Sequence, residues 1–219
     1  MFDHAGFIGA ARALANAHGP AAVTVDSIAQ YLKAPKGSFY HRFASRDALL
    51  GELWLTTVLA YQEGFVAAIE AGDGLAAALH TPAWSRAHPD DARLLLLYSR
   101  HDFVQGDFPA PLKRGVREQA ERFEACLVRF ARDAFGSSRP SQLKRGVREQ
   151  AARFEACLAR FARDAFGRAG PAQIKRATFV LAEVPIAAVK GYLERREPPP
   201  PLADELIETT YRAIVNART

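Results

Sequence analysis

Hydrophobic residues recur at helical spacing along most of the chain, and no stretch shows the alternation expected of a strand. The first apolar face, which stops before Gly19 and Pro20, comprises Phe7, Ile8, Ala11, Leu14 and Ala15. Thr24 is placed to cap a short second helix, and Pro35 suits the first turn of a short third helix. The pattern therefore predicts an all-α fold that begins with three short helices.

A long helix is expected next. Ser45 is placed to cap it, Leu49 to Ile69 supply its apolar face, and Gly72-Asp73-Gly74 ends it. The elements expected after that are, in order, a short helix near 75–80 ending at Thr81-Pro82, a helix from Pro89 to about His101, a loop over 104–111, two repeat helices, a helix over 172–196 that Pro185 can kink, a stiff linker over Pro198–Pro201, and a last helix over 202–217.

An internal repeat occupies the middle of the chain. Leu112–Gly136 and Leu143–Gly167 differ at only two of 25 positions. With their linkers, the repeat units are 112–142 and 143–173. Each copy predicts one amphipathic helix that ends at its final glycine. Solenoid repeats are usually more numerous and more divergent, so we interpret the pair as a recent tandem duplication, with a sequence artefact as the alternative.

The overall charge first suggests nucleic-acid binding, because 29 Lys+Arg face 24 Asp+Glu and the pI is about 9.4. However, residues 112–173 hold 14 Lys+Arg against 7 Asp+Glu, whereas residues 1–50 hold 5 against 3. Residues 143–173 alone contribute +4 of the net +5. We interpret the arginines of the repeat as a solvated helix face with ion pairs rather than a phosphate-binding helix. The excess of basic residues is therefore weak support for DNA binding.

Composition excludes several classes of protein. A hydrophobic share of 49% excludes a disordered chain, and no apolar run approaches the roughly 18 residues of a membrane span. Cys126 and Cys157 lack metal-ligand spacing and are expected to be reduced packing residues. We recognise no signal peptide and no catalytic motif, so we expect a cytoplasmic protein that is not an enzyme and has no cofactor or membrane partner.

The strongest functional signal lies near the N-terminus. The short spacing around Lys33-Ala34 predicts a helix-turn-helix whose third helix enters the major groove of DNA. Residues Val23 to Leu50 read VTVDSIAQYLKAPKGSFYHRFASRDALL. On the combination of Ile28-Ala29, Lys36–Phe43 and Ser45–Leu50, this stretch resembles the N-terminal domain of TetR-family transcriptional regulators.

The resemblance implies a helix-turn-helix DNA-binding domain over 1–46 and a ligand-binding and dimerisation domain over 47–219. The residues indicated as DNA-binding are Thr24, Lys36, Gly37, Ser38, Tyr40, His41 and Arg46. The small residues allow close approach of the helix to base edges, Lys36 can reach a guanine or a phosphate, and the others can bind phosphates. Phe39 and Phe43 are expected to pack in the core.

Three features depart from the family's pattern. Lys33 stands where the family usually has a glycine, and a lysine in the left-handed conformation costs about 1 kcal/mol. Pro35 replaces a small polar residue at the start of the third helix. We see no basic arm of the kind that many members carry before the first helix, and we expect this to weaken nonspecific binding to phosphates.

The resemblance also implies partners. A homodimer formed through 172–196 and 202–217 is expected to bind double-stranded operator DNA, and a small-molecule effector to release it. Aromatic and polar residues of the region 50–103 are candidates for the effector pocket, with ordinary core packing as the alternative for each: Trp54, Tyr61, Trp84, Tyr98, His101 and Phe103. The sequence therefore predicts a ligand-responsive transcriptional repressor.

The duplication has a geometric consequence for this expectation. A helix of 25 residues is about 37 Å long, whereas a six-residue linker spans at most about 20 Å. The linker cannot carry the chain back to its starting end. We therefore hypothesise that the second copy runs antiparallel to the first and displaces or rearranges the pair at 172–217.

Two other functions stay open. A helical enzyme or metal-binding protein is conceivable if His80, His88, His101 and Asp102 converge on a metal ion. The other alternative is a TetR-fold protein that binds a small molecule or metal and has weak or no DNA binding. The three departures from the family's pattern favour this alternative.

Overall fold

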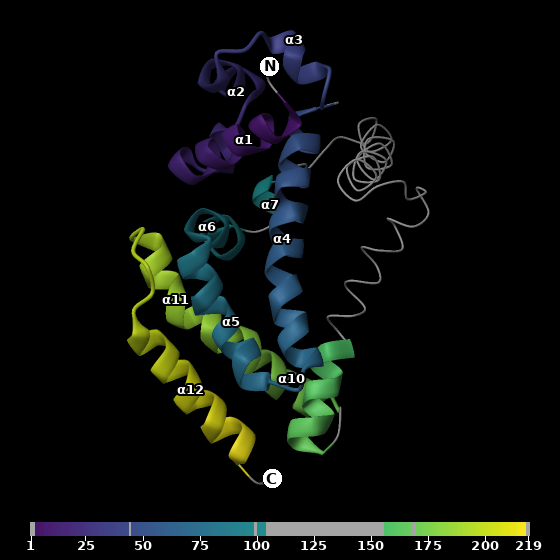
Figure 1. Cartoon of the computed structure of the whole chain (residues 1–219), viewed down its shortest axis with the longest axis vertical. Helices are drawn as coiled ribbons and strands as arrows, with labels where there is room; N and C mark the ends of the chain where they lie inside the picture. The colour runs from purple at the N-terminus through teal and green to yellow at the C-terminus, as the bar shows by residue number, and fades with distance from the viewer. Residues whose placement is uncertain (1–2, 44, 99, 104–155, 168–169, 218–219) are drawn as a thin grey trace. The chain divides into compact units, whose positions relative to one another are not determined.

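The computed structural model describes residues 3–43, 45–98, 100–103, 156–167 and 170–217, without the side chains of Leu55, Arg100 and His101. Every regular element among these residues is a helix, which confirms the all-α class (Figure 1). In chain order they are α1 (His4–His18), the 3₁₀ turn η1 (Pro20–Ala22), α2 (Val25–Leu32), α3 (Lys36–Tyr40), α4 (Arg46–Glu70), α5 (Gly74–Ala87), α6 (Pro89–Leu97), α7 (Arg100–Phe103), a helix over 156–166, α10 (Pro171–Thr178), the π-helical stretch η2 (Phe179–Glu183), α11 (Val184–Glu194) and α12 (Pro201–Asn216).

The described residues fall into two compact units. The first contains the described residues up to Thr56 together with Arg100–Phe103, and the second contains Thr57–Tyr98 with the described residues from 156 onward. Helix α4 contributes residues to both units. The domain division expected after residue 46 stays a prediction.

The first unit is built around three phenylalanines. Phe7 of α1, Phe39 of α3 and Phe43 are fully buried, and their ring centroids lie 5.6–6.1 Å apart. Full burial of one such ring contributes about 1.5–3 kcal/mol. The expectation that Phe39 and Phe43 are core residues is therefore confirmed, and α3 is held to α1 by its own aromatic anchor.

The second unit has α5 at its centre, packed against α6, α11 and α12 (Figure 1). One apolar cluster draws residues from α4, α5, the helix over 156–166, α10, η2 and α12: Phe65, Val66, Ile69, Ala77, Ala78, Cys157, Phe161, Ala162, Ala177, Val180, Leu181 and Ile207. Cys157 is buried in this cluster, in agreement with the packing role expected of it.

Most expected helix boundaries are confirmed by their caps. The Ser45 hydroxyl accepts a hydrogen bond from the N–H of Ala48 at 3.1 Å at the start of α4. Gly72, with φ of 80°, supports the turn after α4, where the chain needs a left-handed residue. Pro201, which the sequence predicts to be the last residue of the linker, instead occupies the first turn of α12, where its missing N–H is tolerated.

The expected break at Thr81-Pro82 is wrong, because α5 continues through Pro82 to Ala87. Proline removes one helical hydrogen bond, but the turn around it is buried by tertiary packing. The Thr81 hydroxyl also lies 2.9 Å from the Tyr61 hydroxyl of α4. These contacts hold the turn in place although the local sequence disfavours it.

Two further boundaries differ from expectation. The helix expected from Pro89 to about His101 ends at Leu97, since Tyr98 is extended, and the short α7 follows. The helix expected over 172–196 is interrupted by η2 immediately before Pro185. There the N–H of Val184 bonds the carbonyl of Phe179, five residues back, so a π-helical turn accommodates the proline instead of a simple kink.

Most of the duplicated segment lies outside the described residues. The first copy with Cys126, the loop expected over 104–111 and the start of the second copy lie outside them. The described end of the second copy is the helix over 156–166, and Gly167 follows it with φ of 76°, as expected for a C′ residue.

Candidate DNA-binding surface

Thr24 begins the helix-turn-helix as the N-cap of α2. Its hydroxyl accepts a hydrogen bond from the N–H of Ser27 at 3.0 Å, and the N–H of Thr24 donates to the Ser27 hydroxyl at 2.8 Å. This reciprocal pair is a capping box with serine in the place of the usual glutamate. Thr24 is exposed, so its capping role leaves it on the surface where a phosphate contact is predicted.

The turn between α2 and α3 keeps the geometry that glycine normally provides. Lys33 has φ of 52° and ψ of 40°, in the left-handed region. The N–H of Lys33 bonds the carbonyl of Gln30 at 3.1 Å, and the N–H of Ala34 bonds that of Ala29 at 2.9 Å, which together form a Schellman motif. The strain of about 1 kcal/mol expected for this lysine therefore applies.

Helix α3 presents small and polar side chains to solvent. Gly37 is exposed, and an added Cβ would meet nothing within 4 Å. Tyr40 is 61% exposed and His41 is exposed. Phe39, which precedes them in the chain, is fully buried. Ser38 is half-buried and its carbonyl accepts a hydrogen bond from Arg42 at 3.0 Å. The helix is thus fixed by one face and free on the other.

Lys36 at the start of α3 has an acidic neighbour. Its ammonium lies 2.7 Å from the Asp26 carboxylate of α2, and both side chains are mostly exposed. An exposed pair of this kind contributes at most about 1 kcal/mol, because water screens it. Lys36 is therefore at the surface as predicted, with part of its charge balanced by Asp26.

Arg46, which the sequence predicts to contact a phosphate, is engaged by groups of its own chain. Its guanidinium donates to the carbonyls of Val23 and Pro20, the latter at 2.8 Å, and to the Asp47 carboxylate at 3.1 Å. These bonds tie the start of α4 to the segment that precedes α2. They make Arg46 a residue that positions the helix-turn-helix, which sequence reasoning did not anticipate because the carbonyls lie far away along the chain.

A buried carboxylate in the same unit was also missed. Glu52 of α4 is 1% exposed, and His4 of α1 is its neighbour at 3.2 Å. This is an ion-pair distance, but both Glu52 oxygens lack a hydrogen-bond partner within the described structure. Burial therefore raises the pKa of Glu52 from 4.5 to about 7. The only signal in the sequence was an acidic residue within the apolar run of α4.

Four of the six residues predicted for an effector pocket come together in two groups. In the first unit, the Trp54 and Phe103 rings lie 4.9 Å apart. In the second, Tyr61 contacts Trp84 at 5.3 Å between ring centroids and packs against His80 at 5.1 Å. Tyr98 is half-buried, and the side chain of His101 is not described.

The Tyr61 group is closely packed and its polar atoms are satisfied. The Tyr61 hydroxyl lies 2.9 Å from the Thr81 hydroxyl, and His80 Nε2 lies 2.8 Å from the Tyr61 carbonyl. Burial raises the pKa of Tyr61, although the bond from Thr81 opposes this, and burial lowers the pKa of His80. These features are typical of a core contact between α4 and α5.

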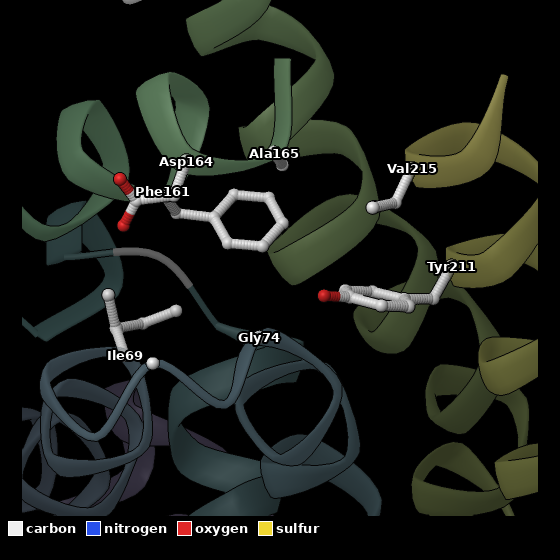
Figure 2. Close-up of a pocket in the computed structure, with 8 residues that line it drawn as sticks. Ile69, Gly74, Phe161, Asp164, Ala165, Tyr211 and Val215 are labelled. Atoms are coloured by element: carbon white, nitrogen blue, oxygen red, sulfur yellow. The ribbon is translucent and has the colours of Figure 1, made fainter. Parts of the chain in front are cut away.

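A small cavity in the second unit is lined by none of the six predicted residues. Its volume is about 190 Å³, and it lies among the end of α4, the start of α5, the helix over 156–166 and α12. Figure 2 shows the rings of Phe161 and Tyr211 beside Gly74, so close that an added Cβ would clash with both side chains. The lining residues are Ile69, Gly72, Gly74, Phe161, Asp164, Ala165, Tyr211 and Val215. Burial and then the charge of Asp73 raise the pKa of the Tyr211 hydroxyl.

The metal hypothesis gains no support from the part of the chain that is described. No three His, Cys, Asp or Glu side chains gather there in an arrangement that holds a metal ion. His80 is bonded to the Tyr61 carbonyl, and His88 packs its ring against Trp84 at 5.4 Å.

No described helix is long and apolar enough to cross a membrane.

Comparison with known proteins agrees with the placement of the helix-turn-helix. Residues 7–53 match a family model described as bacterial regulatory proteins, tetR family. The matched segment begins in α1, contains α2, the turn and α3, and ends in the first part of α4. No curated protein and no solved structure matches the chain.

Proposed function

We propose that the chain is a DNA-binding transcriptional regulator of the TetR family, which the match over residues 7–53 supports. We further propose that it is a repressor, that it acts in the cytoplasm as a homodimer, and that a small-molecule effector releases it from operator DNA. The observation that carries the proposal is the two-sided character of α3. Phe39 is buried against α1, while Gly37, Tyr40 and His41 are exposed on the other side.

The proposed DNA contacts follow from the exposed groups. Gly37 and Ser38 allow the backbone to approach base edges, and Lys36 reaches a guanine edge or a phosphate once it leaves Asp26. Thr24, Tyr40 and His41 bind phosphates on either side of the groove. Arg46 belongs to this proposal as a positioning residue, because its guanidinium holds the start of α4 against Pro20 and Val23.

The test of a repressor is its effect on transcription. A reporter joined to the intergenic DNA upstream of the gene is expected to be more active in cells that lack the chain than in cells that contain it. Reporter activity that falls when the chain is removed would show an activator instead. The same purified chain is expected to retard that DNA, and not an unrelated duplex, in a gel-shift experiment.

The exposed apolar residues of the last helices support the proposed dimer. Leu202 and Leu206 of α12 are 53% and 56% exposed and lie one turn apart on the same face. Phe179 and Ile174 are also exposed, within the segment 172–196. Residues of this kind are usually buried, and a four-helix interface from two copies would cover them.

We predict that Leu206→Glu separates the dimer. A charge at a half-exposed leucine leaves the monomer core intact, but it places an unpaired carboxylate in the proposed interface. Light scattering coupled to size exclusion is expected to give twice 24.0 kDa for the parent chain and 24.0 kDa for the variant. Ala67→Glu, which adds the same charge at an exposed position on α4, is the control and should stay dimeric. A dimeric Leu206→Glu chain would contradict the proposed interface.

For the effector, the cavity beside Gly74 is the better-supported site. It offers an apolar wall with the Tyr211 hydroxyl and the Asp164 carboxylate at its edge, whereas the Tyr61 group is filled by its own rings. Compounds that raise reporter activity only when the chain is present are candidate effectors. We expect Ala165→Phe, which fills the cavity, to abolish this response while DNA binding is kept.

A further inference from the structure

We infer that Lys33 is a further phosphate-binding residue of this protein, placed in the helix-turn-helix turn where it adds a free positive charge to the DNA-binding surface. The inference rests on the proposed contacts of α3 with DNA. It assigns a function to a residue that, from the sequence alone, argues against DNA binding.

The first argument is the location of charge in the DNA-binding unit. Residues 1–50 contain five Lys and Arg residues, which must supply the attraction to phosphates: Arg12, Lys33, Lys36, Arg42 and Arg46. Four of them are engaged by other groups. Arg46 bonds the carbonyls of Pro20 and Val23, and Lys36 pairs with Asp26 at 2.7 Å.

The two remaining arginines are also occupied. Arg42 donates to the Ser38 carbonyl at 3.0 Å, and its guanidinium lies 5.7 Å from the centroid of the Phe7 ring. Arg12 has a buried Nε and interacts with another group. Within the described part of this unit, Lys33 is therefore the basic residue whose ammonium is exposed and has no ion-pair partner.

The second argument is backbone strain. Lys33 adopts φ of 52° at the C′ position of α2, where glycine is unstrained, and its exposed side chain gains no burial in return. Strained positions that persist without a packing benefit are common at functional sites. A charge that binds DNA phosphate is a benefit that glycine cannot supply.

The third argument is position. The turn that carries Lys33 leads directly into Lys36 and Gly37, the first residues of α3 (Figure 1). The recognition helix of a helix-turn-helix contacts base edges with its N-terminal residues, and the phosphates of the DNA backbone border the groove that it enters. The long lysine side chain gives the ammonium further reach toward those phosphates.

The experiment measures how DNA affinity depends on salt. The full-length chain is titrated into a fluorescent duplex from the upstream intergenic DNA over a series of salt concentrations. Loss of one phosphate contact per protomer is expected to reduce the slope of log Kobs against log salt by about 1.8 for the dimer. By the same relation, affinity at about 0.15 M salt falls by about 30-fold.

Two substitutions at Lys33 separate the charge from the backbone. Lys33→Gly removes both the charge and the strain, so we expect weaker DNA binding together with a thermal midpoint raised by about 2–4 °C. Lys33→Gln removes the charge and keeps the strained backbone, so we expect the same loss of slope without the gain in stability.

The chain offers a matched control. Arg196 is a non-glycine residue with φ of 61° at the equivalent position after α11, in the second unit. Arg196→Gly removes one positive charge and one left-handed side chain, as Lys33→Gly does. We expect it to leave the salt slope of DNA binding unchanged.

The outcomes are distinguishable. If both Lys33 variants keep the slope of the parent chain, or if Arg196→Gly lowers it equally, the assignment of Lys33 is wrong while the DNA-binding role of α3 stands. If the parent chain shows no affinity for the intergenic duplex, the proposed function fails, and the assignment of Lys33 fails with it.

Discussion

The combined substitution Tyr40→Phe and His41→Ala is expected to reduce operator affinity by about 1,000-fold. Each side chain is proposed to give one hydrogen bond to a phosphate, so a dimer would lose four. At about 1 kcal/mol for each bond, the loss is about 4 kcal/mol, which is close to three factors of ten. A fluorescence-anisotropy titration at fixed salt measures it.

The substitution leaves the fold intact for a structural reason. Tyr40 is 61% exposed, and phenylalanine keeps the edge contact of its ring with Phe39, whose centroid lies 5.3 Å away. His41 is exposed and follows the last residue of α3. We therefore expect thermal unfolding to be unchanged within about 1 kcal/mol.

A matched control is available in the same unit. Tyr31 is 56% exposed on α2, and His18 is exposed at the end of α1. Neither is among the proposed contacts, so Tyr31→Phe combined with His18→Ala should bind the operator as the parent does. Equal affinities for the Tyr40/His41 variant and this control would show that DNA is bound by another surface.

Glu52 is expected to make the DNA-binding unit less stable as the pH rises from about 4.5 to about 7. Its pKa is 4.5 in an unfolded chain and about 7 in the folded unit. Between these values the folded state holds the proton more often than the unfolded state, so folding is favoured at the acidic end and the benefit is lost toward neutral pH. The pKa difference corresponds to about 3 kcal/mol.

Glu52→Gln tests this directly, because glutamine resembles the protonated carboxyl and does not titrate. We expect the variant to match the parent near pH 4.5 and to exceed its free energy of unfolding above pH 7, by up to about 3 kcal/mol. Urea unfolding across that pH range measures the difference. Glu63→Gln, at an exposed glutamate of α4, should show no such divergence. A parent chain whose stability rises with pH from 4.5 to 7, while Glu52→Gln stays flat, would contradict the prediction.

The predictions that were confirmed depend on residues close together along the chain. Thr24 and Ser45 cap helices through N–H groups three residues away, and Gly167 ends a helix through its own conformation. The turn at Lys33 retained the glycine geometry because its hydrogen bonds reach back only to Gln30 and Ala29. Local chemistry of this kind can be recognised from the sequence.

The features that were missed depend on contacts between distant segments. Arg46 bonds carbonyls 23 and 26 residues away, and Pro82 continues a helix because its turn is buried by tertiary packing. The cavity is lined by four segments that no local pattern brings together. Glu52 was overlooked because an acidic residue on a helix is usually solvated, and only the three-dimensional structure reveals its burial.

If Lys36 binds a DNA phosphate as proposed, its ion pair with Asp26 competes with that contact. A carboxylate held 2.7 Å from the ammonium occupies the place that a phosphate oxygen would take. On that proposal every duplex displaces Asp26, whatever its sequence, so Asp26 weakens binding to random DNA and to the operator alike. The Asp26 carboxylate would thus act as a phosphate mimic. Long-lived binding would be limited to DNA sites whose base contacts compensate for the lost ion pair.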